Sequence, residues 1–390
     1  MASQLSHPAT PPARPSAALR WLRLGVVAFV LAMVGWRWDA QTGFTALIRF
    51  GDNFETTRLP AVRSLPLKSH PGAGYDGQFY AQLAVDPHFT APEVQTALDN
   101  PAYRARRIGL SLLAHVLGFS SPWWTLQIYA LLNTAAWLLF AWLCWREIGA
   151  GDLRSTLRWC AIVLGLGALD SVRLSLTDLP AALLILLAVR SARRARPALA
   201  AGWLLLAGFA RETAILALPG LWRGAVRSWP DRVRFLLAAA ACALPLAAWA
   251  FWLQSTLPGA GGGAGNFLPP GQGLAGHAAE CFAAFASGNF DSRYVWGLIG
   301  AAALGLQSVA LLLRWRDPNP WVRTAIPFAL LYWCLGPAVW HSYWTAARAL
   351  LPLTLAYNLT LPDSGRGFWW RFGLGNACAL HAIYRLLPDL

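Results

Sequence analysis

The carboxylates most able to do chemistry lie in polar segments between long apolar stretches. The most distinctive segment, residues 75–80 (YDGQFY), contains Asp76, and a carboxylate there could take the proton of an attacking hydroxyl group. The competing interpretation is that Asp76 only caps the helix that follows it. Asp52 and Asp178 are two further candidates, for which a turn and a helix cap, respectively, are the simpler explanations.

Five arginines are candidates for binding a phosphate group, because guanidinium groups match its geometry: Arg104, Arg107, Arg173, Arg211 and Arg348. Most of them also have a simpler role. Arg104 and Arg107 could bind lipid headgroups, and Arg173 could pair with Asp170 three residues earlier. Arg211 could reach the membrane surface with its long side chain.

Polar side chains close to these charges are candidates for a substrate pocket: Tyr75, Gln78, Tyr80, Glu212, His341 and Tyr343. For His341 an ordinary polar contact is the simpler role. No group of acids or histidines has the spacing of metal ligands, so no metal is required. Asp76 together with another acid could nevertheless hold one divalent cation, Mg or Mn.

The chain that must position these side chains is too apolar for a soluble protein of its length. Of its 390 residues, 56% are hydrophobic and 13% are charged, and 22 are tryptophan. The apolar runs predict an all-α polytopic integral membrane protein with about eleven transmembrane helices. Residues 1–20 are predicted to be a disordered cytoplasmic tail, and residues 21–390 a single transmembrane domain.

Arginines cluster in every second loop, for example at residues 146–158, 190–196 and 314–323. This alternation follows the positive-inside rule and predicts a cytoplasmic N-terminus. The net charge of +14 is therefore mostly a matter of topology, and nucleic-acid binding is not expected. Arg348 departs from the rule, because it opens a span on the outer side, and this favours phosphate binding.

Two long outer segments remain, residues 37–122 and residues 254–294. In the first, a short amphipathic helix from Asp76 to Pro87 is predicted to lie along the membrane surface. A second helix is predicted to start near Pro101, with one polar stripe made by Arg104, Arg107, Ser111 and His115. In the second segment, the glycine-rich residues 259–265 predict a flexible lid, followed by a helix over residues 274–286. If the spans form one bundle, the charged groups of all outer loops converge on one outer cavity.

These elements resemble the GT-C superfamily of integral-membrane glycosyltransferases, most closely its bacterial members assigned to cell-surface glycopolymer formation. The resemblance rests on the element at residues 75–80, Thr-Asp-Leu-Pro at 177–180, Arg-Glu-Thr at 211–213 and Arg-Ala-Leu-Leu-Pro at 348–352. The chain is more distantly similar to the protein O-mannosyltransferase, aminoarabinose transferase and GPI mannosyltransferase branches.

The resemblance implies a polyprenyl-phosphate-linked sugar donor and a glycan, lipid or protein acceptor. It also implies transfer on the periplasmic face of the bacterial inner membrane, with an acid of the first outer loop acting as a base or orienting the acceptor. That acid is Asp76 here. Many members place the acid just after the first span, where this chain has Asp39 and Asp52, so the base is either Asp76 or Asp52.

Two other functions fit some of the same residues. Ionisable groups inside a membrane also mark the substrate paths of transporters and lipid-linked glycan flippases. The polar residues collect at one face rather than at the midplane, and no inverted repeat is evident, so a transporter is the weaker interpretation. A third possibility is a non-catalytic scaffold for cell-surface polysaccharide assembly.

Overall fold

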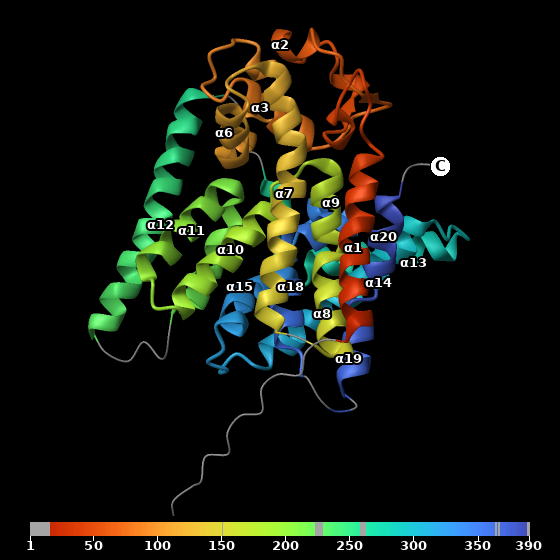
Figure 1. The fold of residues 1–390 in the computed structure, drawn as a ribbon, viewed down its shortest axis with the longest axis vertical. Helices are drawn as coiled ribbons and strands as arrows, with labels where there is room; N and C mark the ends of the chain where they lie inside the picture. Colours follow the sequence, from red (N-terminus) through yellow and green to blue (C-terminus); the bar gives the residue numbers. More distant parts are fainter. Residues whose placement is uncertain are drawn as a thin grey trace, which may run out of the picture.

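The computed structural model of the protein describes residues 16–149, 151–222, 229–257, 263–362, 365 and 367–387. Helices packed side by side form one bundle, and a layer of short helices covers one end of it (Figure 1). Residues 1–15 of the predicted tail and residues 259–262 of the predicted lid lie outside the described residues. The last part of that tail is helical, because the first helix begins at Ala17 after Ser16 caps it.

Four helices within the described ranges are long and apolar enough to cross a membrane: α1 (Ala17–Gly35), α7 (Pro122–Ile148), α12 (Trp229–Thr256) and α14 (Ser292–Leu312). The other bundle helices are shorter: α8 (Leu153–Val163), α9 (Leu166–Leu174), α10 (Asp178–Arg193), α11 (Pro197–Ala210), η3 (Glu212–Leu221), α15 (Pro320–Cys334), α17 (Tyr343–Ala349), α18 (Leu351–Thr360), α19 (Gly367–Gly375) and α20 (Ala379–Leu386). The prediction of an all-α fold is confirmed. The predicted number of about eleven spans is not confirmed.

Several predicted spans are divided into two helices. The apolar residues 157–169 predict one span, but α8 ends at Val163 and α9 begins at Leu166. Between them Gly165 adopts an extended backbone, with ψ of 144°, which no helical residue has. Hydropathy alone does not record such a break, because both halves are apolar.

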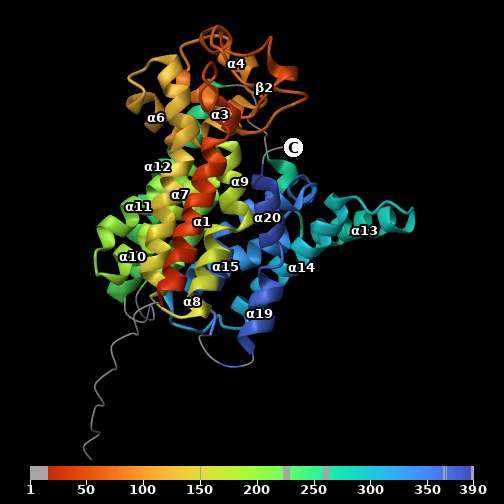
Figure 2. The same ribbon diagram turned by 45° about the vertical axis from the view of Figure 1, so that its right-hand side comes forward.

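The loop layer, which we define as residues 37–121, contains nine short elements: η1 (Thr45–Leu47), β1 (Phe50–Gly51), η2 (Asp52–Phe54), α2 (Pro60–Arg63), β2 (Ser69–His70), α3 (Gly77–Val85), α4 (Val94–Ala97), α5 (Pro101–Ala105) and α6 (Ile108–Leu117). The strands β1 and β2 form one short parallel pair. Figure 2 shows this layer stacked on the end of the bundle where α7 begins and α9 ends. The layer therefore lies over one end of the bundle rather than along its side.

Helix α3 occupies the centre of the loop layer. It begins one residue after Asp76 and ends before Pro87, as the sequence predicts. The amphipathic character predicted for it is wrong, because every residue from Gly77 to Ala84 is buried within the protein and no face is exposed. Asp76 also does not cap the helix with its side chain, which leaves the carboxylate free for other contacts.

Helix α3 is covered by the polar stripe predicted for the helix that starts near Pro101. The helix that begins at Pro101 breaks after Ala105 and resumes as α6, and its stripe faces α3. Ser111 donates to the backbone carbonyl of Tyr80 at 2.7 Å, and a ring nitrogen of His115 lies 3.0 Å from the carbonyl of Ala84. The stripe thus satisfies polar groups inside the layer.

The arginine-rich loops at the opposite end of the bundle also fasten helices together. Arg158 donates to the carbonyl of Leu361 at 3.0 Å, and Arg314 donates to the carbonyl of Thr360 at 2.9 Å. Both carbonyls belong to the C-terminal end of α18, where helical carbonyls have no partner within the helix. These arginines therefore contribute to packing as well as to charge asymmetry.

The second outer segment contributes η4 (Ala264–Asn266) and α13 (Gln272–Ala286). A further short helix, α16 (Pro337–Trp340), follows α15. The helix predicted over residues 274–286 is thereby confirmed as α13, and Figure 2 shows it projecting from the side of the bundle. On another side, α12 reaches the loop layer, where the indole of Trp249 donates to the carbonyl of Ala105 at 3.0 Å.

A buried glutamine holds three parts of the loop layer together, and this generates a stability prediction. The Gln82 amide accepts from the backbone N–H of Leu59 at 2.9 Å and donates to the carbonyl of Ala97 at 3.0 Å. Gln82→Leu keeps the size but leaves both backbone groups unsatisfied. We expect a loss of about 2 kcal/mol or more, measured as a lower melting temperature in detergent. Gln95→Leu, at an exposed site on α4, is the matched control and should leave the melting temperature unchanged.

Candidate functional site

A cavity of about 470 Å³ lies where the loop layer meets the bundle. Its polar wall contains two acids and five arginines: Asp76, Glu212, Arg104, Arg106, Arg107, Arg211 and Arg348. Its lining also has an apolar part, formed by Leu331, Leu335, Ala338 and Val339 from the end of α15 and from α16. The cavity therefore joins a strongly charged surface to an apolar one.

The polar wall is assembled from distant parts of the chain. Helix α5 and the turn after it supply three arginines, the joint between α11 and η3 supplies Arg211 and Glu212, and α17 supplies Arg348. Tyr75 lines the same cavity. Seven of the residues proposed from the sequence thus meet in one place, which is the convergence expected from a closed bundle.

Asp76 is held between two arginines. One carboxylate oxygen lies 3.0 Å from Arg104 Nη2, and the other lies 3.8 Å from Arg348 Nη2. Burial alone would raise the pKa of this carboxyl, but the two guanidinium groups outweigh burial and lower the pKa to about 2. Asp76 is therefore ionised at neutral pH, and a weak base as long as both arginines face it.

Arg104 and Arg107 are each neutralised by a carboxylate in a two-bond arrangement. Arg104 donates to Asp99 at 2.8 and 2.6 Å, and Arg107 donates to Glu212 at 2.8 and 2.7 Å. The phenol oxygen of Tyr80 lies behind the wall and accepts from Arg107 at 2.8 Å and from Arg104 at 3.4 Å. Burial raises the pKa of Tyr80, so the phenol is neutral while it orients both guanidinium groups.

Arg211 is also neutralised, by Asp178. Asp178 is the first residue of α10 and its side chain is almost completely buried, so it faces Arg211 away from water. The two form an ion pair, and Arg211 also donates to the hydroxyl of Thr213 at 3.3 Å. Asp178 therefore lies behind the cavity wall as the partner of an arginine.

Two arginines of the wall lack such a partner. Arg348 is 4% exposed, its closest carboxylate is Asp76 at 3.8 Å, and its buried Nε forms no hydrogen bond. Its guanidinium lies over the ring of Tyr75 at 5.1 Å. Arg106 packs over the ring of Tyr103 at 5.9 Å, its buried Nε is also unpaired, and no carboxylate pairs with it in the part of the chain that the structure describes. These two side chains have unused capacity to bind an anion.

Five predicted site residues lie elsewhere. Asp52 is exposed on η2, and His341 is exposed and contacts Arg293 at 3.1 Å. Arg173 lies beside Asp170 at 3.7 Å, which is the alternative that the sequence left open for it. Gln78 is buried, where it accepts from the backbone of Gly51 at 3.0 Å and so holds the loop layer together.

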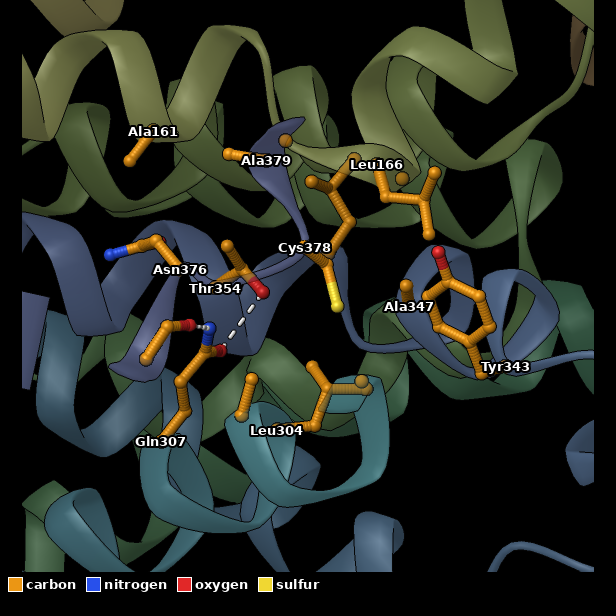
Figure 3. Close-up of a pocket in the computed structure, with 16 residues that line it drawn as sticks. Ala161, Leu166, Leu304, Gln307, Tyr343, Ala347, Thr354, Asn376, Cys378 and Ala379 are labelled. Carbon is orange, nitrogen blue, oxygen red and sulfur yellow. Dashed lines mark hydrogen bonds between the residues drawn. The ribbon is translucent and has the colours of Figure 1, made fainter. Parts of the chain in front are cut away.

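Tyr343 is the fifth, and it lines a different pocket. Figure 3 shows it at the edge of a small cavity of about 40 Å³, together with Gln307, Thr354 and Cys378. The Thr354 hydroxyl donates to Gln307 at 2.9 Å there. Tyr343 itself contacts the ring of His381, so its hydroxyl is occupied within the bundle.

Four residues of the site were not anticipated: Arg106, Asp99, Tyr103 and Asn266. Arg106 falls off the polar stripe if residues 101–117 form one helix, because it is two residues from Arg104 and one from Arg107. The break after Ala105 turns it into the cavity. In the sequence Asp99 is an acid five residues before Arg104, and this spacing does not predict an ion pair. The structure shows that the two side chains form one.

The expected divalent-cation alternative depends on two acids facing each other. Here Arg104 contacts both Asp76 and Asp99, so a guanidinium lies between the two acids. Among the described residues, no three acidic, histidine or cysteine side chains gather as a metal-binding group.

No protein-family model matches the chain, and no curated protein or solved structure matches it. The family resemblance therefore remains a prediction carried by its sequence elements. Three of those elements, at residues 75–80, 211–213 and 348–352, supply side chains to the same cavity. Function is inferred below from the chemistry of that cavity.

Proposed function

We propose that the protein is a membrane glycosyltransferase of the GT-C type. It transfers a sugar from a polyprenyl-phosphate donor to a hydroxyl group of a cell-surface glycan, glycolipid or protein. The observation that carries the proposal is the cavity lined together by Asp76, by two arginines that lack a two-bond carboxylate partner, and by apolar side chains. In this proposal the shorter helices also lie in the inner membrane, which gives about eleven spans, and the cavity opens to the periplasm.

The charge of the cavity supports an anionic ligand with one charge. Five arginines face four carboxylates, which are Asp76, Asp99, Asp178 and Glu212, so one positive charge is left over. A polyprenyl-phosphate sugar is a phosphodiester and carries one negative charge, whereas a diphosphate carries two. We therefore favour a monophosphate donor whose phosphate binds Arg348 and Arg106.

The apolar wall suits the lipid part of such a donor. Leu331, Leu335 and Val339 line the same cavity as the arginines. A polyprenyl chain that enters along these side chains would bury apolar surface at about 25 cal/mol per Å². The two walls together therefore fit an amphipathic ligand better than a free sugar phosphate.

Donor binding would also change Asp76. A phosphate on Arg348 would neutralise one of the two cations that hold the carboxylate pKa low, so the pKa would rise and Asp76 would become a stronger base. In the transfer, the bond between the sugar carbon and the phosphate oxygen breaks, and the acceptor oxygen forms the new glycosidic bond. The acceptor proton passes to Asp76, and polyprenyl phosphate leaves with its charge against the arginines.

The first test removes the carboxylate. Asp76→Asn keeps the size of the side chain, and we expect transfer to fall by about 10² or more, the range for loss of a general base. The assay incubates purified protein with a panel of labelled polyprenyl-phosphate sugars and follows label in the acceptor fraction. Asp52→Asn alters an exposed acid outside the cavity and is the matched control, with activity expected at the wild-type level. Loss of transfer in Asp52→Asn alone would instead assign the base to Asp52.

The second test compares Arg348 and Arg106, which lack a two-bond carboxylate partner, with Arg211, which is paired with Asp178. Arg→Lys keeps the charge but loses the planar fork that binds a phosphate through two bonds. We expect Arg348→Lys and Arg106→Lys each to reduce kcat/KM about 10- to 150-fold, the range for losing one charge-assisted hydrogen bond. Arg211→Lys should have a smaller effect, because Asp178 already occupies that guanidinium. Wild-type kcat/KM in the Arg348→Lys, Arg106→Lys double variant would show that neither arginine binds the donor phosphate, whereas absence of transfer by the wild-type protein itself would favour the scaffold interpretation.

The third test uses pH. In the free protein the pKa of Asp76 is about 2, so its carboxylate is protonated only as the pH falls toward that value. Since kcat/KM reports the free enzyme and kcat the substrate complex, kcat/KM should show no acid limb from Asp76 above about pH 4. The acid limb of kcat should lie at higher pH, because a phosphate bound to Arg348 weakens the interaction of Arg348 with Asp76 and so raises the pKa of Asp76 in the substrate complex. Profiles of both constants with identical acid limbs would contradict the proposed activation.

A further inference from the structure

A second large cavity, of about 630 Å³, lies at the opposite end of the bundle from the charged cavity. It is a groove between the start of α11, the end of η3 and the first half of α12. Its lining is almost entirely apolar, with Ala198 and Ala201 from α11, Leu218 and Leu221 from η3, and Ala238 from α12. Small alanine side chains leave the space open.

The groove opens sideways, toward the surroundings of the bundle. Helix α12 stands at the edge of the molecule, away from the central helices (Figure 1). Only Cys242 and Leu253 of this long apolar helix are fully buried. A groove beside such a helix faces the hydrocarbon of a membrane, where an acyl chain fills it without exposing apolar surface to water.

One mouth of the groove is charged. Arg234 lines it and is 75% exposed, with Asp231 as the acid 4.0 Å away. The turn between α10 and α11, which supplies Ala195 and Pro197 to the same groove, also carries the exposed Arg194 and Arg196. Among the residues that the structure describes around this mouth, three arginines and one acid make the surface positive. Beyond it, α12 continues from Arg234 to Ala241, about 10 Å of apolar wall.

We propose that this groove binds an anionic diacyl phospholipid, with its phosphate at Arg234 and one acyl chain between α11 and α12. An apolar slot that ends in a cluster of arginines is complementary to a molecule with an anionic head and a long apolar chain. The site does not depend on the proposed transferase activity, because no residue of the charged cavity takes part in it.

Native mass spectrometry of the full-length protein in detergent tests the site, with phosphatidylglycerol and phosphatidylcholine of identical chains as probes. We expect the phosphatidylglycerol adduct to be retained preferentially. Ala238→Trp fills the groove and should weaken retention of this lipid at least about tenfold, the loss when some two methylene groups can no longer be buried. Arg234→Gln should weaken it about fivefold, the contribution of one arginine beside an anionic lipid.

Two control variants carry the same substitutions outside the groove. Ala243→Trp lies on an exposed face of α12, and Arg232→Gln alters an exposed arginine that does not line the groove. Both should retain phosphatidylglycerol at the wild-type level, and melting temperatures identify any variant that fails to fold. Equal retention of the two lipids by the wild type would overturn the proposal, as would equal losses in Arg234→Gln and Arg232→Gln.

Discussion

A guanidinium group removed from water must find negative charge or hydrogen-bond acceptors, and this requirement shapes the end of the molecule where the loop layer meets the bundle. Arg104 and Arg107 are both buried at the base of the loop layer. Their partners come from three places: Asp99 just before α5, Tyr80 on α3, and Glu212 at the joint between α11 and η3. The Arg107–Glu212 ion pair attaches the loop layer to the bundle, and the hydrogen bonds of both arginines to Tyr80 tie α3 to the same place.

The same requirement decides which arginines remain free for a ligand. Asp178 forms an ion pair with Arg211, and Glu212 forms one with Arg107. These two arginines of the cavity wall therefore stabilise the structure and are less available to a ligand. Arg348 shares Asp76 with Arg104 at a longer distance, and its Nε has no partner. A charged cavity in which most charges are already paired is rigid, and a ligand of one charge has few positions in it.

Sequence patterns predicted the composition of this site better than its geometry. Asp76, Arg348 and Glu212 were singled out because ionisable groups are rare in so apolar a chain, and the structure brings them together. Arg106 was missed because helical periodicity over residues 101–117 places it off the polar stripe, and only the break after Ala105 turns it inward. Gln78 was predicted to line the substrate pocket because it belongs to the distinctive motif at residues 75–80. In the structure its side chain instead accepts a hydrogen bond from the backbone N–H of Gly51. Apolar runs predicted an all-α fold. Hydropathy did not predict where one apolar run is divided into two helices, as α8 and α9 are at Gly165.

The ion pairs that close the cavity also set an order of assembly during synthesis. Asp178 and Arg211 are 33 residues apart in the chain, whereas Arg107 must wait for Glu212, which follows 105 residues later. At the usual speed of translation that interval lasts roughly 5 to 20 s. During it the loop layer is already made, and of the partners that Arg107 has in the structure only the hydroxyls of Tyr80 and Tyr103 have been synthesised. Arg107 therefore gains the carboxylate that neutralises it only once the joint between α11 and η3 has been made.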